Sequence, residues 1–164
     1  MLMPSGPVEM LLGAFVDECV SIHAVMDASD YFDVSIEAAG MRMARLVRRP
    51  TAMVVLSPKL KPAERRRVGR AGTEPTIPGL EPPPPAPKLR VDYAVTGPDF
   101  AKFIPRDKSV ADDCPLAAID SSTTVTFTGW TGLFDGDVHV SARRLPYRVN
   151  GTLVERVIAM FTAV

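Results

Sequence analysis

The residues of this chain that could do chemistry are few and far apart. Nucleophilic catalysis needs a serine or cysteine beside a base that a third group orients, and His23 and His139 are the only two histidines. The sequence holds no Gly-x-Ser-x-Gly motif, and His139 lies between two valines in an alternating run that is typical of a strand. We therefore predict that the protein is not an enzyme.

Metal and phosphate sites are equally weak predictions. Cys19 and His23 are four residues apart, so on a helix they could share a metal, but zinc needs two more ligands and no second close pair is present. Cys114 is the second of only two cysteines, and we expect both to be free thiols. No glycine-rich phosphate loop occurs. We expect no metal site and no cofactor.

Basic residues are concentrated in one third of the chain, between positions 42 and 70. A flexible basic arm can make salt-dependent contacts with phosphates without reading base sequence, although a solvated surface loop is the ordinary alternative. If the chain contacts double-stranded DNA, we expect the contacts to come from Arg42, Arg45, Arg48, Arg49, Arg65, Arg66 and Arg67.

Composition predicts one folded domain over residues 1–164. The chain has 164 residues, 46% of them hydrophobic, and a formal net charge of zero, which argues against a surface built wholly to hold nucleic acid. No window reaches the ~18 apolar residues of a membrane span, and acidic residues interrupt the segment where a signal peptide would be apolar. We expect a cytoplasmic protein, or a nuclear one if its source is eukaryotic or viral.

The first half of the chain reads as one helix and three strands. Apolar residues recur at helical spacing over residues 8–26, and alternation of apolar and polar residues predicts a strand at 31–37. Met41 and Met43 would open the next strand, and residues 51–57 would form a strand covered on both faces.

Residues 58–88 differ in composition, being basic first and rich in proline afterwards. Proline cannot donate to a strand ladder, and consecutive prolines favour polyproline II. We interpret this insertion as a loop or a semi-rigid arm.

The second half is predicted to hold a strand at 89–95, a short helix at 98–104, an irregular stretch at 106–121, and three strands. The three strands would be separated by Asp135-Gly136 and Asn150-Gly151, both strong hairpin signals, and the last would run from 152 to 164. Set side by side, the halves suggest an α+β fold made of two βαβββ units with their helices on one face of antiparallel sheet.

Several segments carry a resemblance to a known family. Residues 31–37, 40–44 (Gly-Met-Arg-Met-Ala) and 48–56 resemble the opening of DNA sliding clamps of the archaeal and eukaryotic type and of the related checkpoint clamps. Residues 92–104 and 143–149 fit the same family more loosely. The resemblance implies the clamp fold, in which a ring encircles DNA and partners dock outside. On this basis we expect a non-catalytic, clamp-like processivity or scaffold subunit in a DNA-associated complex.

An alternative from another class is a structural subunit of a viral or bacterial particle, acting through protein–protein contacts. The apolar closing strand and the arm at 58–87 would then contact neighbouring subunits. Both hypotheses expect protein partners or a homo-oligomer.

Overall fold

A single five-stranded antiparallel sheet forms the centre of the structure, with strand order β2-β1-β5-β4-β3. The computed structural model describes residues 19–70, 83–120, 123–149 and 151–164. The strands are β1 (Thr51–Lys59), β2 (Lys88–Thr96), β3 (Thr124–Gly129), β4 (Val138–Val149) and β5 (Thr152–Ala163). The helices are α2 (Ile22–Phe32), α3 (Ile36–Leu46) and α4 (Pro62–Arg70), with a short 3₁₀ turn η1 (Pro115–Ala118).

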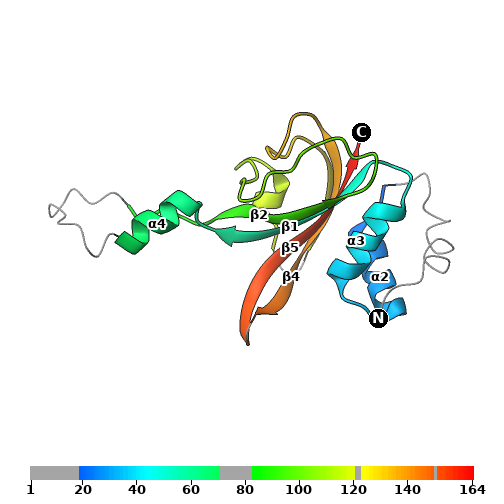
Figure 1. Ribbon diagram of the computed structural model, residues 1–164, viewed down its shortest axis with the longest axis horizontal. Coiled ribbons are helices and arrows are strands. Elements are labelled where there is room, and N and C mark those ends of the chain that lie inside the picture. The colour runs from blue at the N-terminus through cyan, green and yellow to red at the C-terminus, as the bar shows by residue number, and fades with distance from the viewer. Residues whose placement is uncertain (1–18, 71–82, 121–122, 150) are drawn as a thin grey trace.

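Helices α2 and α3 cover one face of the sheet (Figure 1). Each begins at a serine whose hydroxyl accepts a backbone N–H three residues on, Ser21 from Ala24 and Ser35 from Ala38. The apolar side chains of this layer come from alternate positions of the central strands and from the helices. They include Met53, Val55, Ile158 and Met160 of the sheet and Val25, Ala39, Met43 and Ala44 of the helices.

The opposite face of the sheet is covered by the largely irregular segment between β2 and β4. Its buried side chains, such as Phe100, Leu116 and Phe134, pack against the other set of alternate strand residues. Phe134 makes edge-to-face contacts with Phe100 and Phe161, with ring centroids 5.9 and 6.1 Å apart. Two apolar layers on the two faces therefore share one sheet.

The prediction for residues 31–43 was wrong. The strand expected at 31–37 is the junction of α2 and α3, and Met41 and Met43 lie within α3. Asp33 takes a left-handed conformation, with φ of 50°, that ends α2, and Ser35 then caps α3. The alternating pattern of residues 32–36 records two helix ends and not a strand.

The second helix expected, at 98–104, is also absent from the structure described. Those residues are irregular, and Phe100 and Ile104 are held in the core without a helix. The expected helix at 8–26 lies outside the described residues up to position 18, and α2 begins only at Ile22. The α+β class is confirmed, whereas the arrangement of two βαβββ units is not.

Other predictions in the sheet are confirmed. The strands expected at 51–57, 89–95 and 123–128 correspond to β1, β2 and β3, and the irregular stretch at 106–121 contains only η1 among its described residues. At the predicted Asn150-Gly151 hairpin, Val149 of β4 pairs with Thr152 of β5 and Gly151 has a φ of 81°, while Asn150 lies outside the described residues.

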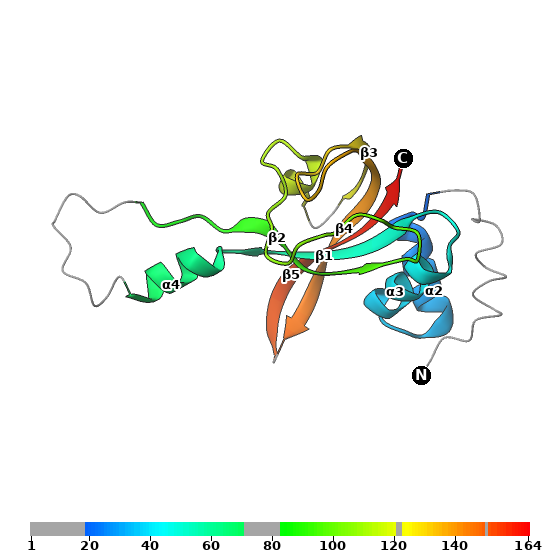
Figure 2. The same cartoon turned by 45° about the horizontal axis from the view of Figure 1, so that its top comes forward.

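The insertion at 58–88 is more ordered than a loop. Strand β1 continues to Lys59, which pairs with Lys88 of β2, and α4 follows. Residues 71–82 lie outside the described part, so only the two ends of the predicted arm are placed. Figures 1 and 2 show α4 projecting from the body, away from α2 and α3, at the end of a stalk formed by the paired ends of β1 (residues 57–59) and β2 (residues 88–90). None of the described helices is long and apolar enough to cross a membrane.

A core substitution tests this two-layer arrangement. Phe161 is fully buried in β5, so Phe161→Ala should lower the free energy of unfolding by about 3–5 kcal/mol through lost burial and a cavity. Phe103→Ala is the matched control, because that ring is 81% exposed and its loss should change stability by less than about 0.5 kcal/mol. Denaturant unfolding of both variants measures the difference, and equal effects would contradict the described core.

Candidate functional site

The basic residues expected to contact DNA lie in two separate groups. Arg42 and Arg45 are on α3, and Arg48 and Arg49 follow it, whereas Arg65, Arg66 and Arg67 are on α4. Figures 1 and 2 place α3 and α4 at opposite ends of the molecule. The structure therefore does not bring the seven arginines together on one surface.

The two groups differ in their surroundings. In the first, the Arg49 guanidinium lies 3.4 Å from the Cys19 sulfur, and Arg42 is half-buried. In the second, all three arginines are exposed on α4. Arg65 and Arg66 of the α4 group line a hollow, described below.

Helix α4 is oriented by a capping interaction at its first turn. Pro62 is the first helical residue, where its missing N–H costs nothing. The Glu64 carboxylate accepts the Lys61 backbone N–H at 2.7 Å, which satisfies a donor that the helix leaves free. The same carboxylate lies 3.9 Å from the Arg90 guanidinium, so the helix start is tied to the sheet.

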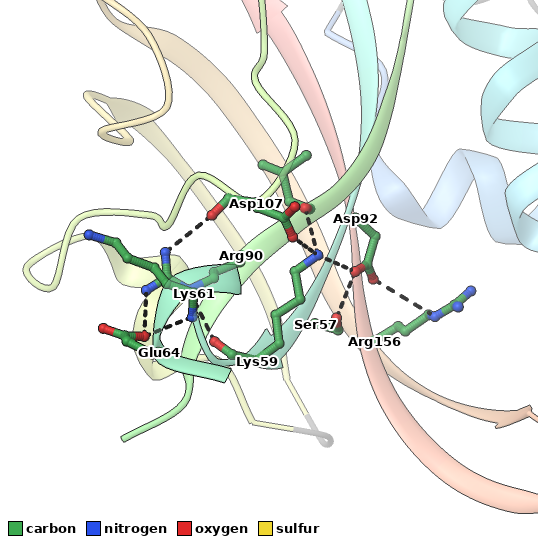
Figure 3. Close-up of polar contacts among 9 residues, drawn as sticks. Ser57, Lys59, Lys61, Glu64, Arg90, Asp92, Asp107 and Arg156 are labelled. Atoms are coloured by element: carbon green, nitrogen blue, oxygen red, sulfur yellow. Dashed lines mark hydrogen bonds and ion pairs between the residues drawn. The ribbon is translucent and has the colours of Figure 1, made fainter. Parts of the chain in front are cut away.

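Arg90 is the buried centre of the site. Its side chain is 2% exposed, which is rare for arginine without partners. It donates to the carbonyl oxygens of Lys59, at 3.0 Å, and Asp107, at 3.1 Å. The guanidinium thus joins β1, β2 and the segment after residue 104 at the root of the arm (Figure 3).

Lys59 lies between two carboxylates. Its ammonium is 2.8 Å from Asp92 Oδ1 and 2.8 Å from Asp107 Oδ1, and it donates to the Val91 carbonyl at 2.9 Å. The hydrogen bond and charge of Lys59 hold the pKa of Asp107 below its ordinary value, with smaller contributions from neighbouring arginines. The three N–H donors of the Lys59 ammonium are therefore all engaged by groups of the protein itself.

Asp107 is held in a conformation that only a few non-glycine residues adopt. Its φ is 63°, in the left-handed region. Its N–H donates to the Val91 carbonyl at 2.9 Å, while its own carbonyl and carboxylate accept from Arg90 and Lys59. These contacts offset the backbone cost, and such strain is concentrated at functional sites.

The network continues across the sheet to α3. Asp92 accepts from Ser57 at 2.8 Å and lies 4.0 Å from Arg156 Nε (Figure 3). Arg156 also pairs with Glu37 at 3.1 Å, and Tyr93 donates its hydroxyl to the same carboxylate. Burial and that hydrogen bond raise the pKa of Tyr93 above its ordinary value.

A hollow of about 550 Å³ opens beside this network. It is lined by Lys59, Pro62, Arg65, Arg66, Asp92, Arg106 and Asp107. Four of these residues are basic and two are acidic, so the lining has a formal net charge of +2, and its exposed charges include the guanidiniums of Arg65, Arg66 and Arg106. None of the three has an ion-pair partner within 4.0 Å among the described residues. An anionic group of the size of a phosphate fits this chemistry.

The residues considered for catalysis are scattered. His23 and His139 each meet a threonine hydroxyl, of Thr124 at 3.3 Å and Thr128 at 3.1 Å. Cys114 is buried, which raises its pKa, and both cysteines are free thiols. Across the described ranges, no group of three or more histidine, cysteine, aspartate or glutamate residues gathers as metal ligands would.

Sequence reasoning found Arg65 and Arg66 but missed Lys59, Arg90, Asp92 and Asp107. The sequence places Arg90 and Asp92 only within the strand predicted at 89–95. The sequence does show charges of opposite sign close together in the predicted strand, at Arg90 and Asp92. It does not show that the pairing of β1 with β2 brings Lys59 next to them.

No protein-family model matches this sequence, and no curated protein matches it significantly. The site must therefore be interpreted from its own geometry.

Removing the Lys59 charge tests the electrostatics of the site. In Lys59→Met the Asp107 carboxyl should titrate closer to the ordinary value of 3.8, and carboxyl chemical shifts measured by NMR across pH would report it. Because the folded-state pKa of Asp107 is depressed, the stability that the pair contributes is present above about pH 4 and is lost as pH falls through the folded value.

Lys88→Met is the matched control, since Lys88 pairs with Asp112 in a more exposed position. It should leave the titration of Asp107 unchanged. An Asp107 that titrates identically in both variants would contradict the described contact.

Proposed function

We propose that this protein is a non-catalytic binding subunit of a larger assembly and that it acts through protein–protein contacts. The observation that carries the proposal is that two ordered elements project from the sheet and bury little against the rest of the described chain.

The first projection is α4 on its stalk. The helix has nine residues and contributes no side chain to either apolar cluster. Helices shorter than about 12 residues are marginal in water on their own. Val68 on this helix is 49% exposed. Such a helix gains stability when a partner covers it, which supports a docking role.

The second projection is the tip of the β4–β5 hairpin. The two strands pair without interruption from Val138–Ala163 to Val149–Thr152, but β3 reaches only Arg143 and β1 only Val157. The tip beyond those residues is a two-stranded ribbon with no third strand, which is marginally stable by itself.

Apolar side chains are exposed on this ribbon. Leu153 is 61% and Tyr147 44% exposed, and Arg156 stacks 4.3 Å above the Tyr147 ring. A hollow of about 160 Å³ lies between the ribbon and the start of α3, lined in part by Ile36, Leu145 and Ile158. Exposed apolar groups of this kind favour a protein partner.

Substitution at the ribbon tip tests the proposal. In extracts of the cells that make it, the native protein should sediment well above the 17.8 kDa of one chain. Leu153→Asp should shift it toward lower mass, because a buried charge opposes docking. Val164→Asp is the matched control, since Val164 is 85% exposed at the other end of β5.

A second variant removes the arm. Lys59 and Lys88 are cross-strand partners, so an Asn-Gly turn between them should replace residues 60–87 and leave the sheet folded. We expect a normal thermal transition and loss of the high-mass species. A native protein found only at the mass of one chain would refute the proposed role.

Contact with nucleic acid is the second candidate, favoured by the arginines around the hollow beside α4. Arg65, Arg66 and Arg106 offer exposed planar guanidiniums that form no ion pair among the described residues, which suits phosphate oxygens. Of the Arg66 guanidinium, only Nε is engaged within the described part of the chain, by the Pro62 carbonyl at 3.3 Å. Encirclement of DNA in a clamp-like ring receives less support, because the described strands form one sheet instead of two matched units.

Charge reversal separates the two groups of arginines. If the hollow binds phosphates, Arg65→Glu with Arg66→Glu should lower affinity for double-stranded DNA at least tenfold and reduce its salt dependence. Arg45→Glu with Arg48→Glu should have a smaller effect, since those residues lie at the opposite end. Filter binding at several salt concentrations measures both, and absence of any salt-dependent affinity in the native protein would exclude this candidate.

A further inference from the structure

The two edges of the sheet are protected to very different degrees. At the β2 edge, residues 107–110 run alongside the first half of the strand. Asp107 and Val110 donate to the carbonyls of Val91 and Leu89 at 2.9 and 3.1 Å, and Val91 donates to the Lys108 carbonyl at 3.0 Å. Charged side chains at Arg90 and Asp92 and a register shift beside Val55 protect this edge further.

The β3 edge has none of these devices. Its sequence, Thr-Val-Thr-Phe-Thr-Gly, contains no charge and no proline, and its pairing with β4 is unbroken over all six residues. No backbone hydrogen bond from another described segment reaches β3 on its outer side. An uncharged, regular edge with free backbone groups is a template for another strand.

The backbone groups that face outward belong to the threonines. Hydrogen-bonded and non-hydrogen-bonded pairs alternate along an antiparallel ladder. The bond from the Ala163 N–H to the Pro50 carbonyl shows that odd-numbered residues of β5 face β1. Following the continuous registers through β4, odd-numbered residues of β3 face β4, so Thr124, Thr126 and Thr128 present N–H and C=O outward.

The side chains of β3 alternate between the two faces of the sheet. Val125 and Phe127 are half-buried and pack at the margin of the apolar layer on one face. Thr126 and Thr128 are exposed on the other face. A strand added here would extend both the hydrogen-bonded ladder and the apolar layer if it carried the same alternation.

We propose that β3 pairs antiparallel with β3 of a second copy of this chain across a two-fold axis. The observations favour a second copy because the strand is self-complementary. Centred on Thr126, the pairing sets Thr124 opposite Thr128 and Val125 opposite Phe127, and it forms about six backbone hydrogen bonds. The resulting contact is isologous and closes as a dimer with a continuous ten-stranded sheet.

Other strands of this chain are poorer partners. The β2 edge is covered over residues 89–91 and charged at Asp92, and β1 is paired along both of its edges. The edges of β4 and β5 that are free at the ribbon carry Arg144, Pro146 and Glu155, which disfavour pairing with another strand. Self-pairing would supply part of the assembly proposed above, yet it can be tested on purified protein alone.

Substitution at Thr126 tests the pairing. Thr126→Pro removes an outward N–H that the monomer does not use, and Thr126→Lys introduces a charge at the junction. We expect the purified protein to weigh twice 17.8 kDa at high concentration by light scattering, and both variants to weigh 17.8 kDa. Thr152→Lys, at an exposed site on the distant ribbon, should keep the dimer mass. A thermal transition like that of the native protein establishes that each variant is folded.

Cysteine crosslinking tests the register. In a Cys19→Ser background, Thr126→Cys should form a disulfide-linked dimer under mild oxidation, because it opposes itself. Thr124→Cys and Thr128→Cys should crosslink when the two variants are mixed and much less when each is alone.

A monomeric native protein at every concentration, or a dimer that both Thr126 variants retain, would overturn the inference. The proposed assembly role would survive either result if the native protein still sediments at high mass in extracts and Leu153→Asp still reduces it. Failure of self-pairing is thereby distinguished from failure of the binding role.

Discussion

The burial of β1 on both of its faces and along both of its edges is the constraint on which the rest of the structure depends. Six consecutive residues, from Thr51 to Leu56, are fully buried. Even positions of this strand enter the layer under the irregular segment, and odd positions enter the layer under α2 and α3. A strand buried in this way must have covering elements on both sides and partner strands on both edges, since each of its backbone polar groups needs a partner.

The approach of the helices to the sheet follows from small residues at the contacts. Gly40 of α3 faces Met53, and a methyl group there would lie 2.7 Å from the methionine sulfur. Gly97, just after β2, donates to the Thr51 carbonyl, and a methyl group there would lie 2.2 Å from the Ala44 carbonyl oxygen. These glycines allow α3, β1 and the end of β2 to meet within backbone contact distance.

Beyond the two apolar layers, the strands are held together by hydrogen bonds and ion pairs. At the root of the arm β1 and β2 leave the apolar layers, and the buried Arg90 and the ion pairs of Lys59 hold the strands where apolar contacts no longer do. A charged network of this kind contributes less to stability than to a defined geometry, because the desolvation of the charges offsets most of their attraction. It therefore fixes the direction of the stalk and the surroundings of the α4 arginines. The same loss of neighbours at the β4–β5 tip leaves Tyr147 and Leu153 exposed.

The features that depend on local order could be predicted from the amino-acid sequence. Local order predicted the strands that correspond to β1, β2 and β3, and Asn150-Gly151 predicted the hairpin, because strand burial and turn conformation are encoded over a few neighbouring residues. The same local pattern predicted a strand at 31–37, where Asp33 and Ser35 instead end one helix and begin the next. A period of two over so few residues cannot distinguish a strand from two helix ends, and packing on the sheet decided between them.

The network of Lys59, Arg90, Asp92 and Asp107 depends on tertiary structure alone, since its members are separated by up to 48 positions and meet through strand pairing. Charge and spacing in a sequence do not say which strands become neighbours, and in this protein the register of β1 against β2 supplies that information.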